Sequence, residues 1–215
     1  PRRSASGVAT ITVITKPWKC GGACIYCPND LRMPKSYLSD EPACQRAERN
    51  YFDPYLQVTS RLRALNQMGH VTDKIELIVL GGTWSDYPRA YQIWFITELF
   101  RALNDADDKL PGRSTSFSGE GDKLPGRSSS FEAANARERR QFYRDCGLSY
   151  ERDDLVAFTQ AQQCLVNEGE LTYNEAMVNL YETGEPWKAI AKHQHATLDE
   201  LEREHVRNEQ AAHRV

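Results

Sequence analysis

The chain has 215 residues, of which 40% are hydrophobic and 27% are charged, a composition typical of a globular protein with a buried core. Its net charge of -3 gives no general attraction to nucleic acid, so such binding has to come from a local basic patch. No apolar run is as long as the roughly 18 residues of a membrane span, and the N-terminus lacks the apolar core of a secretory signal.

The first predicted element is a β-strand over residues 7–15. Ala9, Ile11 and Val13 alternate with the intervening residues, and the stretch is rich in β-branched side chains. Lys16-Pro17 ends the strand, since Pro cannot donate to a sheet. A cysteine-rich loop follows at once, at the carboxyl end of the strand, where parallel α/β folds bind ligands.

Residues 43–68 predict a helix that is interrupted at Asp53-Pro54 and capped by Gly69. The apolar run 75–80 predicts a buried parallel strand, closed by Gly81-Gly82-Thr83. Residues 89–103 predict a helix with an aromatic face. This order is the βαβα start of a parallel sheet or barrel, so we expect an α/β fold.

The rest of the chain differs in character. The segment 108–117 recurs at 122–131 with a single change, and its Pro, Gly and Ser content predicts a flexible insertion over 105–131. Residues 132–215 predict mostly helices, with capping boxes at Thr172-Glu175 and Thr197-Glu200. Because two strands make no stable sheet, and the first residue is not Met, we expect the partner strands in a part of the natural protein outside this sequence.

Cys20, Cys24 and Cys27 have the spacing CxxxCxxC, which lets one loop bring three thiolates to one metal. Six cysteines are too sparse for a disulfide scaffold, which favours metal ligands in a reducing, cytoplasmic environment. Structural zinc usually takes four ligands, and only Cys44 or His70 follow at a distance. An iron–sulfur cluster tolerates three cysteines with one iron open. The spacing favours the cluster; a zinc site and unrelated structural cysteines remain the alternatives.

With the aromatic residue before the last cysteine, this motif resembles the radical S-adenosylmethionine superfamily. The resemblance implies a 4Fe–4S cluster held by Cys20, Cys24 and Cys27, whose open iron binds S-adenosyl-L-methionine and whose electron cleaves it to a 5′-deoxyadenosyl radical. It also implies contacts to that cofactor from Tyr26, which would lie against the adenine, and from the glycine motif Gly81, Gly82 and Thr83. The implied fold is the N-terminal part of a (βα) TIM-like barrel, over 1–104.

A closer resemblance is to the Elongator catalytic subunit and the tRNA carboxymethyluridine synthases. It is carried by Ser6-Gly7-Val8-Ala9, Thr15-Lys16-Pro17, Ile25-Tyr26-Cys27-Pro28, Ser36-Tyr37, Glu41-Pro42, Arg46-Ala47, Asp53-Pro54-Tyr55-Leu56-Gln57, Asp73 to Thr83, and Asn208 to Arg214. Residues 104–196 have no counterpart and are interpreted as an insertion. Two departures are Gly21-Gly22, where the family has Pro-His, and Asn29-Asp30 after Pro28, where it has glycines.

The family resemblance implies a tRNA-modifying enzyme. Full members use acetyl-CoA to build a carboxymethyl-type group on the wobble uridine of tRNA, in eukaryotes with other Elongator subunits; this chain would supply part of the radical half. The alternatives are a zinc-stabilised module that binds tRNA or protein without catalysis, and an inactive truncated fragment that still binds a cluster.

Several other residues have two interpretations. Lys16, Lys19, Arg32 and Lys35 surround the loop and would contact phosphate of tRNA or coenzyme A, or would simply be solvated. Arg137 to Arg140 is most simply a charged helix face. We expect Cys44 to be a small helix residue, Cys146 and Cys164 to be buried fillers, and His193 and His195 to be exposed.

Overall fold

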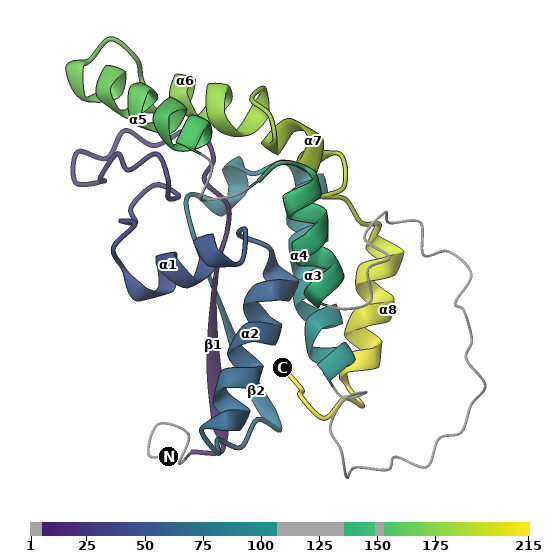
Figure 1. The fold of residues 1–215 in the computed structure, drawn as a ribbon. Helices are drawn as coiled ribbons and strands as arrows, with labels where there is room; N and C mark the ends of the chain where they lie inside the picture. The colour runs from purple at the N-terminus through teal and green to yellow at the C-terminus, as the bar shows by residue number, and fades with distance from the viewer. Residues whose placement is uncertain (1–5, 107–135, 149–152) are drawn as a thin grey trace.

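The computed structural model describes residues 6–106, 136–148 and 153–215. It is a mixed α/β fold with a two-stranded parallel sheet, in which β1 (Val8–Ile14) pairs with β2 (Lys74–Leu80) from Val8↔Lys74 to Ile14↔Leu80. Both strands therefore end at the same edge, where the loops that follow them meet (Figure 1). The predicted duplication over 108–131 lies outside the described residues.

Two helices connect the strands, and the break between them has a local cause. Helix α1 (Pro42–Arg49) ends before Tyr51 and Phe52, which both adopt positive φ. Asp53 then caps α2 (Pro54–Gln67) by accepting a hydrogen bond from the Leu56 amide, with Pro54 in the first turn. The interruption at Asp53-Pro54 is confirmed, and the C-cap of α2 is Met68, with the predicted Gly69 directly after it at a φ of 74°.

The sheet has one covered and one open face. Ala9, Ile11 and Ile75 are buried on the face that shares their register, and α1 and α2 pack against β1. On the opposite face the exposed Thr10 hydroxyl donates to Glu76 at 3.0 Å, and Ile78 is 37% exposed. The expectation of a fully buried second strand is therefore wrong, because the described helices do not cover both faces.

The second strand leads into the centre of the helical core. A short 3-10 turn η2 (Trp84–Asp86) precedes α3 (Arg89–Ala106), which packs against α2. Its aromatic face is buried, as predicted: Tyr91, Trp94 and Phe95 are at most 3% exposed. Helix α3 also packs against α8 (Leu198–Asn208), so it contacts helices from both the N-terminal and the C-terminal part of the chain.

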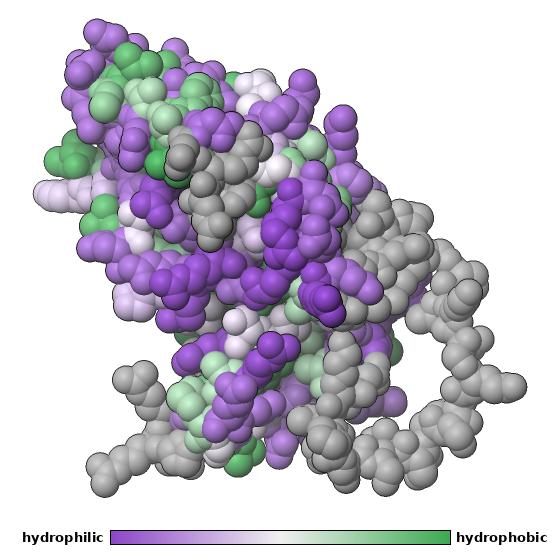
Figure 2. Space-filling view, in the orientation of Figure 1, coloured by the Kyte–Doolittle hydropathy of each residue, from purple (hydrophilic) through white to green (hydrophobic). Residues whose placement is uncertain are grey.

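The C-terminal part is helical, as predicted. Besides α8 it contains α4 (Ala136–Asp145), α5 (Asp153–Glu168), α6 (Tyr173–Met177), the π-helix η4 (Val178–Glu182) and α7 (Trp187–Ala191). Both capping boxes are formed, at the starts of α6 and α8. Helices α5 and α6 lie over the loop that follows β1 (Figure 1). Figure 2 shows a mainly hydrophilic face with hydrophobic residues gathered near α5, which exposes Val156 and Phe158.

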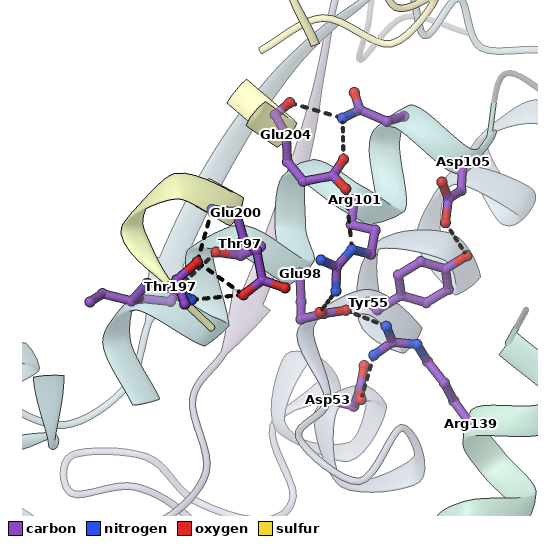
Figure 3. Close-up of polar contacts among 12 residues, drawn as sticks. Asp53, Tyr55, Thr97, Glu98, Arg101, Asp105, Arg139, Thr197, Glu200 and Glu204 are labelled. Atoms are coloured by element: carbon purple, nitrogen blue, oxygen red, sulfur yellow. Dashed lines mark hydrogen bonds and ion pairs between the residues drawn. The ribbon is translucent and has the colours of Figure 1, made fainter. Parts of the chain in front are cut away.

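A buried network of charges fastens α4 to the core (Figure 3). The Arg139 guanidinium is fully buried, forms ion pairs with Asp53 and Glu98, and lies 4.1 Å from the ring centre of Tyr55. The Tyr143 hydroxyl donates to Asp53 at 2.7 Å. The interpretation of residues 137–140 as a charged surface face is thus wrong at Arg139, because two buried carboxylates face it.

The same network continues to α8. Arg101 on α3 pairs with Glu98 of its own helix and with Glu204 on α8, at 3.3 Å for the latter. The Asn104 side chain also donates to the Glu204 carboxylate at 2.9 Å. Helices α3, α4 and α8 and the N-terminal cap of α2 therefore share one set of buried ion pairs and hydrogen bonds.

The outer edge of β2 carries one further parallel bridge. The Ile75 amide donates to the Arg214 carbonyl at 2.7 Å, and the Arg214 amide donates to the Asp73 carbonyl at 3.1 Å. His213 beside it is buried, with its Nδ1 at 2.8 Å from the Thr72 carbonyl oxygen. No helix among the described residues is both long enough and apolar enough to cross a bilayer.

Candidate functional site

The cysteine loop begins directly after β1, at the carboxyl edge of the sheet (Figure 1). Cys20, Cys24 and Cys27 are free thiols, and a turn in which the Cys27 amide donates to the Cys24 carbonyl at 3.3 Å joins the last two. Between them Ile25 and Tyr26 are 88% and 92% exposed. The loop therefore exposes the Cys24 thiol and an aromatic ring, whereas Cys20 and Cys27 are half-buried.

The sulfur atoms have defined neighbours. The Cys20 Sγ lies 3.4 Å from the Thr83 hydroxyl, and the Cys27 Sγ lies 3.1 Å from the Ser36 hydroxyl. A Cβ on Gly22 would lie 3.6 Å from the Cys20 Sγ and 3.8 Å from the Cys24 Sγ. The missing side chain at Gly22 thus leaves space between two of the three sulfurs.

These residues fit a thiolate-bound metal or iron–sulfur cluster. Three soft sulfur donors on one loop suit iron–sulfur clusters and zinc, and the space at Gly22 is open toward two of them. Within the described ranges, no three His, Cys, Asp or Glu side chains come together as a ready metal site. The convergence of the three thiolates on one centre therefore stays a prediction.

The glycine motif lies beside the loop because the parallel register ends both strands together. Gly81 has a φ of +154°, and a Cβ there would lie 1.8 Å from the Thr15 hydroxyl oxygen. Only glycine fits this position without moving Thr15. A cavity of about 430 Å³ opens here, lined by Thr15, Tyr37, Val79, Leu80, Gly81, Gly82, Trp84 and Ile96. It gives the carboxyl edge of the sheet room for a ligand.

Hydrogen bonds from two distant segments hold the first cysteine. Asn174 on α6 accepts from the Cys20 amide and donates to the Cys20 carbonyl, both at 3.0 Å. Asp86 of η2 accepts from the Gly21 amide at 2.7 Å, and its carbonyl accepts from the Trp18 indole at 3.1 Å. Sequence reasoning missed Asn174 and Asp86. The capping box at Thr172 signals where α6 starts, but no local signal places α6 against the loop.

Lys16 lies inside the protein and not on the loop surface. Its residue is 3% exposed, its ammonium donates to Gln194 at 2.9 Å, and it lies 4.8 Å and 4.9 Å from the ring centres of Trp18 and Tyr91. Burial lowers the pKa of Lys16 to about 7, against a smaller opposite effect of Glu182. The interpretation of Lys16 as a solvated loop charge is therefore wrong.

Two tyrosines fix the backbone between β1 and Lys16. The Tyr87 hydroxyl donates to the Lys16 carbonyl at 2.7 Å and lies 2.8 Å from the Thr15 hydroxyl. The Tyr91 hydroxyl accepts from the Lys16 amide at 3.1 Å. Burial raises the pKa of both phenols, so they stay protonated and remain available as donors.

The other basic residues near the loop have acidic, amide or aromatic neighbours. Lys19 pairs with Glu182 at 2.6 Å and keeps 39% of its side chain exposed. Arg32 pairs with Glu48 at 2.8 Å. Lys35 donates to Asn29 and lies 4.2 Å from the ring centre of Tyr173. Lys19 therefore keeps part of its surface available to an anion, whereas the Lys16 ammonium does not.

The other cysteines and two histidines differ in burial, and not all of them match the expectations from the sequence. Cys44 is buried in α1, as expected, and burial raises its thiol pKa to about 11. The expectation of buried fillers is wrong for Cys164, which is exposed, and Cys146 is half-buried. His195 is exposed, and His193 is half-buried against the Phe142 ring.

No family model matches the chain, but about half of it is similar to proteins of one kind. The tRNA uridine(34) acetyltransferase of Methanocaldococcus infernus is 45% identical over 115 residues, which are 51% of this chain and 22% of the relative. The protein of the same name from Dehalococcoides mccartyi is 46% identical over 102 residues, 47% of this chain and 22% of the relative.

Eukaryotic relatives match a similar share. Elongator complex protein 3 of Bos taurus is 42% identical over 115 residues, 48% of this chain and 21% of the relative. A solved structure of Methanocaldococcus infernus Elp3 with an N-terminal deletion shares 33% identity over 46% of this chain and 16% of that chain, with a TM-score of 0.32. The chain thus spans 21% to 22% of the length of these curated relatives. At this identity, about half of the chain is homologous to tRNA uridine(34) acetyltransferases and to Elongator complex protein 3.

Proposed function

We propose that this chain is part of a radical S-adenosylmethionine enzyme that modifies the wobble uridine of tRNA. The observation that carries the proposal is the position of the CxxxCxxC loop, at the carboxyl end of β1 and beside Gly81-Gly82-Thr83 at the end of β2. The homology to tRNA uridine(34) acetyltransferases and Elongator complex protein 3 supports the substrate class. An enzyme of this class is expected in the cytoplasm.

In this proposal Cys20, Cys24 and Cys27 hold a 4Fe–4S cluster, which supplies the electron for reductive cleavage of S-adenosyl-L-methionine. The chain's own residues set the place of that cofactor. The Thr83 hydroxyl lies beside the Cys20 sulfur, and the backbone at Gly81 and Gly82 borders the cavity without side chains. Tyr26 is exposed on the loop and is the proposed contact to the adenine.

The proposed domain organisation has three parts. Residues 1–104 would form the first part of a TIM-like barrel, 105–131 an insertion, and 132–215 a helical segment that leads to a third strand. The parallel bridge of Arg214 beside β2 supports that direction of the chain. The open sheet face with Thr10, Glu76 and Ile78 would be the barrel's interior.

The chain spans 21% to 22% of the length of its relatives. We therefore propose that acetyl-CoA, tRNA and Elongator-type subunits are bound by the whole protein and not by this chain alone. Lys19 is the proposed phosphate contact near the loop, since part of its side chain is exposed. Lys16 would reach a phosphate only if it left its contact with Gln194.

The test is anaerobic reconstitution with iron and sulfide. We expect a brown protein with broad absorbance at about 400 nm, roughly as iron–sulfur clusters show. Cys24→Ala should abolish cluster retention because it removes one of three ligands, whereas Cys164→Ala should retain it, since that thiol lies on α5 and outside the cysteine loop. Equal iron in both variants would contradict the ligand assignment.

Two outcomes separate the alternatives. A colourless protein with stoichiometric zinc, which unfolds on chelation, would identify a zinc-stabilised binding module. A cluster-loaded protein that forms no 5′-deoxyadenosine from S-adenosyl-L-methionine under a strong reductant would identify an inactive fragment.

A further inference from the structure

The contacts around the cysteine loop are unequal. Cys20 and Gly21 are held by side chains from α6 and η2, whereas Cys24 is exposed and its carbonyl accepts a hydrogen bond only from within the loop's own turn among the described contacts. The first cysteine is thus the point where the loop is tied to the rest of the molecule. The residue that ties it from the C-terminal side is Asn174.

Asn174 uses both ends of its side-chain amide on one residue. Its Oδ1 accepts from the Cys20 N–H and its Nδ2 donates to the Cys20 C=O, each at 3.0 Å. This pair of bonds is the pattern that a neighbouring strand would offer to an extended residue. It satisfies both backbone groups of Cys20 and so fixes the direction in which the Cys20 side chain leaves the backbone.

Asn174 is itself held in place. It lies in the first turn of α6, between the two residues of the capping box, Thr172 and Glu175. Its neighbour Tyr173 is buried and donates to the Met33 carbonyl at 3.4 Å, and Tyr181 donates to the Leu31 carbonyl at 2.9 Å. Residues 173–181 are therefore attached to the loop at both ends, and these two hydrogen bonds hold the backbone of Asn174 in place.

We propose that Asn174 is a positioning residue for the first metal ligand: its amide orients the Cys20 backbone so that the thiolate faces the space between Gly22 and Thr83. The part of this inference that concerns a cluster rests on the proposed function. If Asn174 positions Cys20, the segment 153–196 contributes to the site and is more than an insertion beside it. The competing explanation is that Asn174 only attaches α6 to the loop.

The first experiment needs no metal. In the metal-free chain, the alkylation rates of Cys20 and Cys24 by iodoacetamide are followed by peptide mass spectrometry. Asn174→Ala should raise the rate at Cys20 relative to Cys24 by about five-fold, because two hydrogen bonds to Cys20 are lost. The matched control is Asn179→Ala, which removes an amide from the same segment that bonds to Gln162 at 2.9 Å. Its ratio should equal that of the wild type.

The second experiment uses the reconstituted protein. Asn174→Asp keeps the acceptor for the Cys20 amide but places an anion beside the first ligand, so the midpoint potential of the cluster should become more negative than in Asn179→Asp. Equal potentials in the two variants would mean that residue 174 does not lie beside Cys20 in the loaded protein, whereas the alkylation ratio decides whether it orients Cys20. Asn174 is exposed, so replacing it removes no core packing. If Asn174→Ala still fails to fold, the alkylation ratio is measured in Asn174→Asp.

The outcomes are distinct. A Cys20 to Cys24 ratio that is the same in Asn174→Ala and Asn179→Ala overturns the inference, and so do equal potentials in the two aspartate variants. A wild-type chain that takes up no iron overturns the proposed function, while the alkylation ratio still decides whether Asn174 orients Cys20.

Discussion

The buried ammonium group of Lys16 contacts one amide oxygen and two aromatic rings. Removing a cation from water costs free energy that such neutral partners only partly return. Burial therefore lowers the pKa of Lys16 from 10.5 to about 7. Below that pH the cost of the buried charge is present in full, and above the unfolded-state pKa it is absent.

The first prediction follows from this linkage. Between about pH 7 and pH 10.5 the unfolded chain keeps a proton that native Lys16 has released, so stability should rise with pH in this window. The slope should approach about 1.4 kcal/mol per pH unit. Lys16→Met should remove this contribution. Urea unfolding of both proteins across the window measures it; identical slopes would show that Lys16 stays charged in the native state.

The second prediction concerns Gly81. Gly81→Ala should destabilise the fold by more than about 2 kcal/mol, because its φ of +154° disfavours any side chain and the new Cβ would collide with the Thr15 hydroxyl. Gly82→Ala is the control, since its Cβ would meet the Tyr87 hydroxyl oxygen at an ordinary 3.6 Å. We expect the control to change the free energy of unfolding by less than about 1 kcal/mol. Similar thermal midpoints for both variants would refute the collision.

At the scale of elements, α4 depends on one buried arginine. Arg139 faces Asp53 from the start of α2 and Glu98 from α3, so α4 docks only where both carboxylates meet it. Burial raises the pKa of Glu98 in spite of this neighbour and of Arg101, so the carboxylate depends on both arginines to stay charged. The helix is thereby held by electrostatics as well as by Tyr143.

The third prediction tests this docking. Arg139→Met should lower the free energy of unfolding by about 3–5 kcal/mol, because it removes the counter-charge of the buried Asp53 and leaves Glu98 with Arg101 alone. Arg144→Met on the same helix should change it by less than about 0.5 kcal/mol, since Arg144 bonds to the exposed Gln141. Adding Glu98→Gln to Arg139→Met should restore part of the loss. Denaturant titration of the three variants measures this, and equal midpoints for Arg139→Met and Arg144→Met would rule the docking role out.

The elements themselves were largely predictable, and their docking was not. The alternation of residues predicts β1, and Asp53-Pro54 predicts the break before α2. The capping boxes predict the starts of α6 and α8. Each of these signals is local in the sequence. The parallel order of two strands then placed the glycine motif beside the cysteine loop. The burial of Lys16 and Arg139 and the contact of Asn174 depend on partners 41 to 178 residues away, which no local pattern specifies.

At the scale of the whole molecule, β2 is paired unevenly along its outer edge. The Ile75 amide donates to Arg214, and by the two-residue period of a strand the Leu77 and Val79 amides point to the same side. Within the described chain, neither of these two amides has a backbone partner there. The edge is therefore closed at its start and open further along.

The fourth prediction is a difference in hydrogen exchange. The Ile75 amide should exchange more slowly than those of Leu77 and Val79, by about ten-fold or more, because local opening has to break its bond to Arg214 first. Glu76 and Ile78, whose amides point toward β1, serve as internal references. Fast exchange at Ile75, at the rate of Leu77, would mean that the Arg214 bridge does not form in solution.

The bonds that hold the cysteine loop also set the order in which it can form. Lys16 meets a residue 178 positions later, and Cys20 meets one 154 positions later. A ribosome makes the loop before the residues that hold it, so the three thiols of the nascent chain lack these contacts until residues 174 and 194 have been made and have folded against the loop. During that interval the three thiols are open to oxidation, and a metal centre on the assembled loop would form only after it.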